Sequence, residues 1–440
     1  MDMKELSSIM QQNGIVGAGG AGFPTYAKLN TNAETIILNC AECEPLLRLH
    51  RQLLEKYAFE IVDTFHLIGE AVGAKEVIIG IKKAYKKTIE ALNSVIDAYP
   101  EVRLGLLDEV YPAGDEVVLI YEVTGKVVRP GGLPIECGVA VFNVETVYNV
   151  YRALKENAPV VDKVVSIVAE VENPVTVRVP IGTSIEETVR LAGANTTKNA
   201  VYFIGGPMMG RVGSGSEPVT KTTNAVLVLP EDHFIVKMSQ KNTSIDLKRA
   251  AASCCQCSMC TDLCPRNRLG HPIQPHLFMR AATCKDIQEP NIFINTLFCS
   301  SCGLCEMYSC MQGLSPRTLM AEYKAGLRTA GIRPPQVEAK PVGAEREYRK
   351  APMERLMARL DLVKYNKDAP LDESKVDVKK VKIMLSQHIG APASPIVKEG
   401  DVVKVGQMIA EPAKGLSVGI HASIDGMVKK VADKYIIIEA

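Results

Sequence analysis

Eight cysteines lie between residues 254 and 310 in two groups of four, and their spacing has a specific chemical meaning. The first group is Cys254, Cys257, Cys260 and Cys264, followed by Pro265, in the pattern C-x2-C-x2-C-x3-C-P. The second group is Cys299, Cys302, Cys305 and Cys310, in the pattern C-x2-C-x2-C-x4-C. Three thiolates at two-residue gaps hold three corners of one [4Fe–4S] cluster, and in two-cluster proteins the fourth cysteine ligates the other cluster. The spacing therefore predicts two [4Fe–4S] clusters held by these thiolates.

Zinc and disulfide bonds are the alternatives for such a segment. A zinc site takes four tetrahedral ligands, usually from two separated C-x2-C pairs, so a third cysteine two residues further on has no role in it. Disulfides need an oxidising compartment, and residues 1–8 lack the apolar segment of a secretion signal. The whole run resembles a bacterial ferredoxin module. The second group departs from that pattern, because it has one extra residue before Cys310 and Met311 in the place of the proline.

Composition and length exclude several classes of protein. The chain has 440 residues, 47% hydrophobic and 23% charged, which predicts several domains. Its formal net charge of +1 lacks the basic excess of a nucleic-acid-binding protein. The longest apolar runs, such as 77–81 and 225–229, are far shorter than the ~20 residues that a membrane-spanning helix needs. We therefore expect a cytoplasmic protein with no membrane span and no nucleic-acid partner.

The segment 14–25, GIVGAGGAGFPT, has the composition of an anion-binding loop. Closely spaced glycines let backbone N–H groups approach a phosphate, and a helix that begins near Pro24 would add its dipole. The alternative is a flexible turn without a ligand, although turns use one or two glycines. An anion is the natural occupant of this loop.

Three of these glycines also match a dinucleotide fingerprint. Gly17, Gly19 and Gly22 fit G-x-G-x-x-G, and the acidic Glu42 follows twenty residues after Gly22. That motif is meaningful between a strand and a helix, and no strand is predicted before these glycines. The ordinary Rossmann fingerprint is therefore not supported by its context.

A short buried strand predicted over 35–39 ends in the polar run NCAECEP of residues 39–45. Open α/β sheets bind ligands at the carboxyl ends of their strands. The runs GAGGAGFPTYAK and LNCAECEP, together with FNVET at 142–146, resemble the flavin-binding subunit of respiratory complex I. A closer resemblance is to the family that contains the RnfC subunit of ion-pumping ferredoxin:NAD oxidoreductases and the PduS-type cobalamin reductases of bacterial microcompartments.

This resemblance implies an FMN site over which NADH docks. The cofactor-binding candidates are glycines and polar residues of the matching runs: Gly17, Gly19, Gly20, Gly22, Lys28, Asn39, Glu42, Asn143 and Thr146. Lys28 would reach the flavin phosphate, and Asn39 would touch the isoalloxazine ring. The catalytic candidates are Glu44, which would face the nicotinamide, and Glu116, which would lie near the flavin unless it is an ordinary surface acid. The complex I pattern differs in having an aspartate in the place of Ala41 and an arginine in the place of Ala18.

The sequence predicts a multidomain α/β protein. Helix-like and strand-like segments alternate over 46–107, which indicates a parallel sheet covered on both faces, within a Rossmann-like FMN and NADH-binding domain over 1–160. Strand-like segments over 161–235 fit a β-grasp domain, and the family places a soluble-ligand-binding (SLBB-like) domain there. The cysteines fall in a helical two-cluster ferredoxin-like domain over 245–332.

The remaining residues bear on the choice within the family. Prolines and charges over 333–378 are typical of a linker or a partly ordered docking segment. Short strands and glycine turns over 379–440 are similar to the all-β barrel-sandwich hybrid of biotinyl and lipoyl carriers, although His421-Ala-Ser replaces the modified lysine. RnfC-type proteins carry this domain before the glycine loop and PduS-type proteins carry it last. The domain order therefore favours the PduS type.

The resemblance implies an NADH-dependent cobalamin reductase with a corrinoid as electron acceptor. A flavin takes the two electrons of NADH and releases them singly, as iron–sulfur clusters require. The corrinoid-module motif D-x-H-x-x-G is incomplete, because Asp63 lies one residue too early for His66. We therefore expect a partner, such as an adenosyltransferase, to present the corrinoid, with shell proteins as further partners inside a bacterial microcompartment. The alternatives are an RnfC-like electron-input subunit of a membrane ferredoxin:NAD oxidoreductase complex and a non-catalytic iron–sulfur scaffold.

Overall fold

A parallel four-stranded sheet organises the N-terminal third of the chain in the computed structural model, which describes residues 1–284 and 288–440. The strand order is β3 (Val102–Leu107), β2 (Glu76–Lys82), β1 (Thr35–Cys40) and β5 (Val139–Asn143). All the pairings are parallel, and Asn39 of β1 lies opposite Asn143 of β5. The carboxyl ends of the strands therefore meet at one edge, where the polar residues after β1 and β5 converge.

Helices cover both faces of this sheet, as the alternation of segments predicts. One face packs against α1 (Met3–Gln12), α2 (Leu49–Lys56), α3 (Ala58–Val72), α4 (Lys86–Ile96) and α6 (Val144–Lys155). The other face packs against α5 (Glu116–Thr124). Successive side chains of a strand point to opposite faces, so Ile36 and Leu38 join the first core and Ile37 joins the second.

The glycine loop closes on itself and leads into a very short helix. Gly17 N–H donates to the carbonyl of Phe23 at 2.9 Å, and Val16 forms a bridge with Pro24. Gly20 and Gly22 have φ angles of 69° and 67°, in the left-handed region that favours glycine. The helix expected near Pro24 is a single 3-10 turn, η1 (Thr25–Lys28). It is therefore too short to supply a substantial helix dipole.

A mixed six-stranded sheet follows in the chain. Its order is β12 (Leu371–Asp372), β7 (Val175–Pro180), β6 (Asp162–Ala169), β10 (Ala225–Pro230), β8 (Ala200–Ile204) and β9 (Arg211–Gly213). The helix α7 (Ile185–Arg190) packs Ile185 and Val189 into the core of this sheet. A buried ion pair between Lys163 of β6 and Glu145 of α6 ties the sheet to the N-terminal region.

The cysteines lie in a helical region. It contains α8 (Phe234–Ser239), α9 (Thr243–Ser253), α10 (Met259–Asp262), α11 (Pro265–Arg268), α12 (Pro275–Cys284), α13 (Asn291–Ile294), α14 (Leu304–Met307) and α15 (Pro316–Thr329). Phe278, Leu319 and Met320 are fully buried in its core. Many of these helices are short and separated by loops, and the cysteines of this region line two cavities.

Residues 333–378 run back across the molecule. The strand β11 (Ala351–Pro352) pairs with β4 (Val110–Tyr111), and β12 pairs with β7. Between them, α16 (Met353–Arg359) buries Leu356 in a core shared with Leu229 and Leu304. The segment is therefore held by the N-terminal region, the mixed sheet and the cysteine region.

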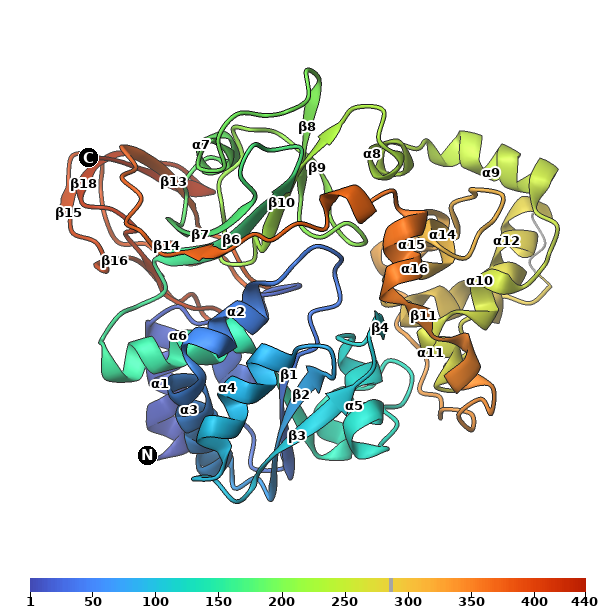
Figure 1. Cartoon of the computed structure of the whole chain (residues 1–440), viewed down its shortest axis with the longest axis horizontal. Coiled ribbons are helices and arrows are strands. Elements are labelled where there is room, and N and C mark those ends of the chain that lie inside the picture. Colours follow the sequence, from blue (N-terminus) through green and yellow to red (C-terminus); the bar gives the residue numbers. More distant parts are fainter. Residues whose placement is uncertain (285–287) are drawn as a thin grey trace.

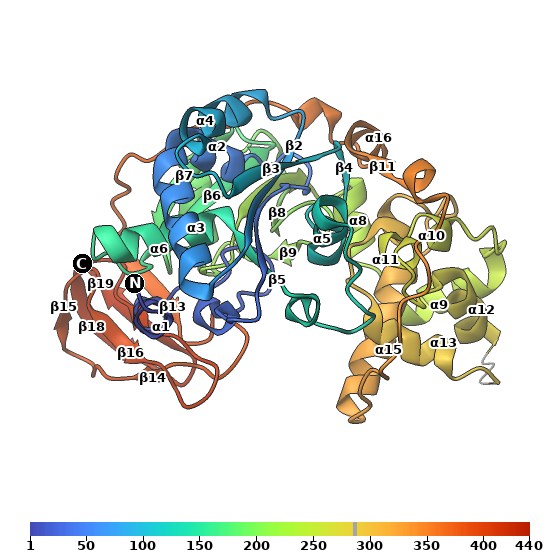
Figure 2. The same cartoon turned by 90° about the horizontal axis from the view of Figure 1, so that it is seen from below.

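Two small antiparallel sheets form the C-terminal domain around one core. The first contains β13 (Lys380–Met384), β19 (Tyr435–Glu439), β18 (Gly426–Val431) and β15 (Val402–Val403), and the second contains β14 (Ser394–Pro395), β16 (Met408–Glu411) and β17 (Ile420–His421). Both views place this domain and the cysteine region at opposite ends of the molecule (Figure 1, Figure 2). Within residues 1–284 and 288–440, no helix is both long and apolar enough to cross a membrane.

Candidate active site and metal centres

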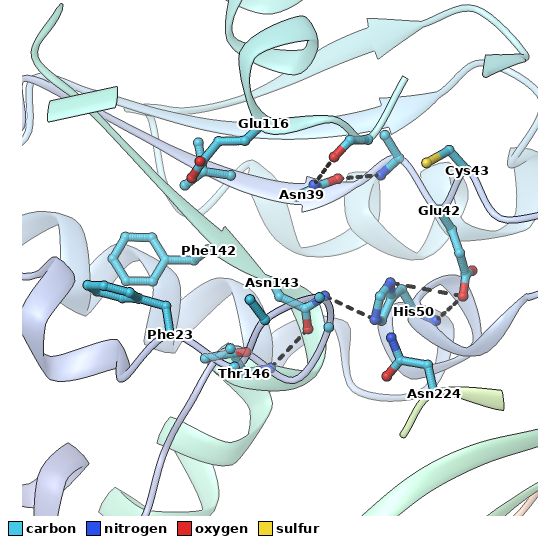
Figure 3. Close-up of a pocket in the computed structure, with 18 of the residues that line it drawn as sticks. Phe23, Asn39, Glu42, Cys43, His50, Glu116, Phe142, Asn143, Thr146 and Asn224 are labelled. Carbon is cyan, nitrogen blue, oxygen red and sulfur yellow. Dashed lines mark hydrogen bonds and ion pairs between the residues drawn. The ribbon is translucent and has the colours of Figure 1, made fainter. Parts of the chain in front are cut away.

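A pocket of about 400 Å³ opens at the carboxyl edge of the parallel sheet (Figure 3). Every residue predicted for the flavin and nicotinamide site lines it: Gly17, Gly19, Gly20, Gly22, Lys28, Asn39, Glu42, Glu44, Glu116, Asn143 and Thr146. They come from the glycine loop, the residues that follow β1, and the junctions that lead into α5 and α6. The volume is in the range of small-molecule and cofactor sites.

The N-terminus of α6 lies at the pocket and fastens the glycine loop. Asn143 Oδ1 accepts hydrogen bonds from the N–H groups of Glu145 at 3.0 Å and Thr146 at 3.3 Å. Thr146 Oγ1 accepts one from Ala18 N–H at 2.9 Å and donates one to the carbonyl of Val16 at 3.2 Å. A helix N-terminus favours anions, so α6 offers a phosphate the dipole that η1 lacks.

Lys28 and Glu116 stand at the outer end of the pocket. Lys28 Nζ donates to the carbonyl of Val141 at 2.7 Å and lies 3.8 Å from Glu116 Oε1. Their side chains are 28% and 43% exposed, so this ion pair is worth little. Lys28 can therefore turn towards an anionic group in the pocket. The rings of Phe23 and Phe142 lie beside each other at the same end (Figure 3).

Asn39 and Glu42 make hydrogen bonds to other residues of the pocket region. Asn39 Nδ2 donates to the carbonyl of Gly114 at 3.0 Å, and its Oδ1 accepts from Ala41 N–H at 3.1 Å. Glu42 Oε1 accepts from His50 N–H at 3.2 Å. Burial raises the pKa of the Glu42 carboxyl. Asn39 therefore ties the end of β1 to the turn before α5, and Glu42 ties the residues after β1 to α2.

Glu44 links the pocket to the turn 205–210 that follows β8. Its Oε2 accepts from Met208 N–H at 2.8 Å, and its buried Oε1 has no hydrogen-bond partner in the described part of the chain. A Cβ at Gly206 would lie 2.3 Å from the Glu44 side chain, so a glycine is needed there. Burial raises the pKa of Glu44 to about 7. Near neutral pH this carboxyl can therefore hold or release a proton.

Sequence reasoning missed other residues that line the pocket, among them Phe23, His50, Phe142 and Asn224. Phe23 and Phe142 lie within the matched runs, where an aromatic ring beside a glycine or an asparagine is a usable signal. His50 is a single histidine six residues after Glu44. Asn224 precedes β10 in a different sheet, and nothing in its local sequence points to the pocket.

The cysteines line two cavities, and the fourth cysteine of each run crosses to the other run. We call the cavity lined by Cys264, Cys299, Cys302 and Cys305 the near cavity. The far cavity is lined by Cys254, Cys257, Cys260 and Cys310, and also by Cys255, which lies outside the ligand pattern. This exchange is that of two-cluster ferredoxins, and Cys310 takes part despite the extra residue before it.

Both cavities are lined by thiols, the ligands of iron–sulfur clusters. Within residues 1–284 and 288–440, no group of three or more His, Cys, Asp or Glu converges on a single metal ion. Burial, with neighbouring thiols, raises the pKa of Cys260 and of Cys264 to about 12. Iron therefore displaces protons from these thiols when it binds.

Three contacts connect the near cavity to residues that adjoin the pocket. The Tyr111 hydroxyl donates to the carbonyl of Cys302. Arg266, two residues after Cys264, lies 3.0 Å from Asp115, the N-cap of α5. Arg317 Nη1 donates at 2.7 Å to the carbonyl of Met208, the residue whose N–H binds Glu44.

Known families match the three parts of the chain that this geometry singles out. A family described as the Nuo51 FMN-binding domain matches residues 10–152, a 4Fe-4S dicluster domain matches 253–315, and the RnfC barrel sandwich hybrid domain matches 362–439. The chain is 40% identical to cobalamin reductase PduS of Salmonella typhimurium, over 98% of this chain and 96% of that protein. The chain belongs to the PduS cobalamin reductase family.

Two other relatives differ in how much of this chain they match. The PduS protein of Citrobacter freundii is 38% identical over 99% of this chain and 96% of its own length. A component of the ion-translocating oxidoreductase complex of Edwardsiella ictaluri is 33% identical, over 59% of this chain and 32% of its own length. The predicted multidomain α/β architecture with an FMN-binding domain, a 4Fe-4S domain and a barrel-sandwich domain is confirmed.

Proposed function

We propose that this protein is an NADH-dependent cobalamin reductase that passes single electrons to a corrinoid. The observation that carries the proposal is one chain in which residues adjoining a flavin-sized pocket contact the near cavity, beside which lies the far cavity. Its similarity to the PduS proteins along almost their whole length supports the same function. The relative from the ion-translocating oxidoreductase complex matches over a smaller part of both chains, which gives the RnfC-like alternative less support.

The pocket residues would hold FMN and orient NADH beside it. The glycine loop lets backbone N–H groups approach the flavin, and the α6 N-terminus and Lys28 would bind its phosphate. Glu42 and Asn39 shape the wall, Glu116 stands at the mouth, and Asn143 and Thr146 fix the loop. Glu44, with a pKa of about 7, would hold or release a proton beside the nicotinamide. Bound FMN supplies the conversion between hydride transfer and single-electron transfer.

The cysteine cavities would hold two [4Fe–4S] clusters. The near cavity is connected to the pocket by Arg266 and Arg317, whereas no residue of the far cavity lines the pocket. Electrons would therefore pass from the flavin to the near cavity and leave the protein from the far cavity. A partner such as an adenosyltransferase would present the corrinoid there, and shell proteins would place the protein in a bacterial microcompartment. These partners are part of the proposal.

The domain division follows the same reasoning. We assign an FMN and NADH-binding domain to 1–160, an SLBB-like β-grasp domain to 161–235, a two-cluster ferredoxin-like domain to 245–332 and a barrel-sandwich hybrid to 379–440. Residues 333–378 would connect the last two. The mixed sheet with α7 packed on it supports the second assignment.

Anaerobic reconstitution tests the function. The protein is loaded with FMN, iron and sulfide and is titrated with NADH, with and without a corrinoid. We expect NADH to bleach the flavin and the corrinoid to reoxidise it while cobalt is reduced. Flavin bleaching without cobalt reduction, when the adenosyltransferase partner is also present, would contradict the corrinoid as acceptor.

A further inference from the structure

The pocket wall that faces Gly19 is built from two different regions of the protein. A Cβ at Gly19 would lie 3.4 Å from Nδ2 of Asn143 and 3.2 Å from Nδ2 of Asn224. Asn143 is the last residue of β5 in the parallel sheet, whereas Asn224 precedes β10 of the mixed sheet. Two side-chain amides thus meet over one glycine, and Figure 3 shows both beside His50.

Asn224 lines the pocket, where its Nδ2 faces Gly19, and its amide oxygen has no hydrogen-bond partner among the described residues. Its Oδ1 is buried. Its backbone is fixed, because its carbonyl accepts from Ser166 N–H at 2.9 Å and the next residue begins β10. A buried carbonyl oxygen without a partner is costly, so rotation of this amide to turn the oxygen towards a ligand N–H or O–H donor would be favourable.

Asn143 has its amide orientation fixed by two neighbours. Its Oδ1 caps α6, so its Nδ2 must face His50, whose Nε2 lies 3.0 Å away. Since Nδ2 can only donate, His50 Nε2 must accept, and the ring proton is on Nδ1, 3.9 Å from Glu42 Oε1. Burial lowers the pKa of His50 to about 4, which keeps the ring neutral.

We infer that the mixed sheet takes part in flavin binding, with Asn224 as a second amide contact opposite Asn143 and with His50 as the residue that positions Asn143. FMN has the donors that Asn224 Oδ1 lacks, on its ring imide and on its ribityl chain. This inference rests on the proposed FMN site and goes beyond it, since that site was placed in residues 1–160 alone.

Protonation of His50 should disturb this arrangement. A protonated ring would turn an N–H towards the Asn143 amino group, and the amide cannot rotate because its oxygen caps α6. The charged groups that face His50 are Glu42, Glu145, which raises the pKa of His50, and Lys163, which lowers it. FMN should therefore bind less tightly as the pH falls towards 4.

The first experiment measures FMN binding to the flavin-free full chain by fluorescence quenching. Loss of one hydrogen bond to a buried group weakens binding about tenfold, so Asn224→Leu should show about that increase in dissociation constant. Asn199→Leu, at an exposed position of the same sheet region, is the matched control and should bind as the wild type does. Asn224→Ser, which keeps a smaller oxygen acceptor, should fall between them.

The outcomes separate this inference from the proposed function. If the wild type binds no FMN, the proposed function fails. If the wild type binds FMN and Asn224→Leu and Asn224→Ser bind it equally well, the proposed function stands and the role of Asn224 is wrong. Circular dichroism identifies a misfolded variant, and Asn224→Ser then decides the question.

The second experiment tests the positioning role of His50. Gln at this position can accept from Asn143 through its carbonyl oxygen, so His50→Gln should keep FMN binding within a few fold while His50→Leu loses about tenfold. The wild type should lose affinity between pH 6 and pH 4 more steeply than His50→Gln, and the comparison cancels the titration of the FMN phosphate. Equal pH profiles, or equal affinities of the Gln and Leu variants, would overturn the role of His50.

Discussion

The near and far cavities each hold four cysteines of the predicted ligand pattern, but their surroundings differ. The near cavity is tied to the flavin pocket through Tyr111, Arg266 and Arg317. The far cavity is held by neighbours outside the pocket wall, such as Gln256, which donates to the carbonyl of His276 at 3.1 Å, and it adjoins Met311, which is 83% exposed. The spacing of the cysteines thus determines which thiols line each cavity. Contacts between distant parts of the chain determine which cavity lies next to the flavin pocket.

The largest effect should come from removing one ligand of each cavity. Cys302→Ser and Cys257→Ser should each reduce the iron content from about eight to about four per chain. Both should lose NADH-driven corrinoid reduction. Cys257→Ser should retain flavin bleaching, because the pocket is built from residues far from Cys257. Anaerobic stopped-flow that follows flavin and cobalt absorbance measures both steps.

Two results would contradict this assignment. Corrinoid reduction by Cys257→Ser at the wild-type rate would mean that the far cavity is not on the path. Loss of electron paramagnetic resonance signals from both clusters in Cys257→Ser would mean that the two cavities do not assemble separately.

Glu44→Gln should change how stability depends on pH. Because the pKa of Glu44 is raised to about 7 by burial, the folded chain binds a proton that the unfolded chain has released between pH 4.5 and 7. The wild type therefore loses stability relative to Glu44→Gln as the pH rises through this window, by about 3 kcal/mol. Urea unfolding of both proteins at pH 5, 6, 7 and 8 measures the difference, and a constant difference would show that Glu44 titrates normally.

Gly206→Ala should disturb the connection between the pocket and the near cavity. The new methyl group would meet the Glu44 carboxylate at 2.3 Å, and such overpacking costs about 1–3 kcal/mol. Gly326→Ala is the control, because nothing lies within 4 Å of its Cβ position in α15, and replacement of a helical glycine stabilises by about 0.5–1 kcal/mol. Thermal unfolding distinguishes the two, and opposite signs are expected.

Arg359→Ala should have the smallest effect. Its guanidinium donates to the carbonyl of Cys310 at 3.3 Å from an exposed position, and such surface changes stay within about 0.5 kcal/mol. Unfolding and iron content should both remain at wild-type values. A loss of far-cavity iron would show that this contact orders the Cys310 loop.

The pocket residues and cysteines that could be predicted from the sequence lie in short motifs of closely spaced residues. The cysteine spacing predicted the crossing of Cys264 and Cys310 because ligand geometry constrains a few neighbouring residues. The helix predicted near Pro24 is present but is a single 3-10 turn, because a local pattern does not show how far a helix continues. Asn224 and His50 could not be found, because their roles arise from the approach of β10 and α2 to β5, which tertiary packing decides.

The C-terminal domain packs against the first helix and the glycine loop. Gln11 donates to the carbonyl of Ser417 and accepts from Gly419 N–H, and the buried Lys221 donates to the carbonyls of both Gly14 and Gly419. Both chain ends also lie at this end of the molecule (Figure 2). A domain in this position can be connected in front of the glycine loop or behind the last sheet with the same neighbours. The domain order expected of RnfC-type proteins is therefore compatible with the contacts that this domain makes here, and relocation of the domain to the other chain end would leave the redox core unchanged.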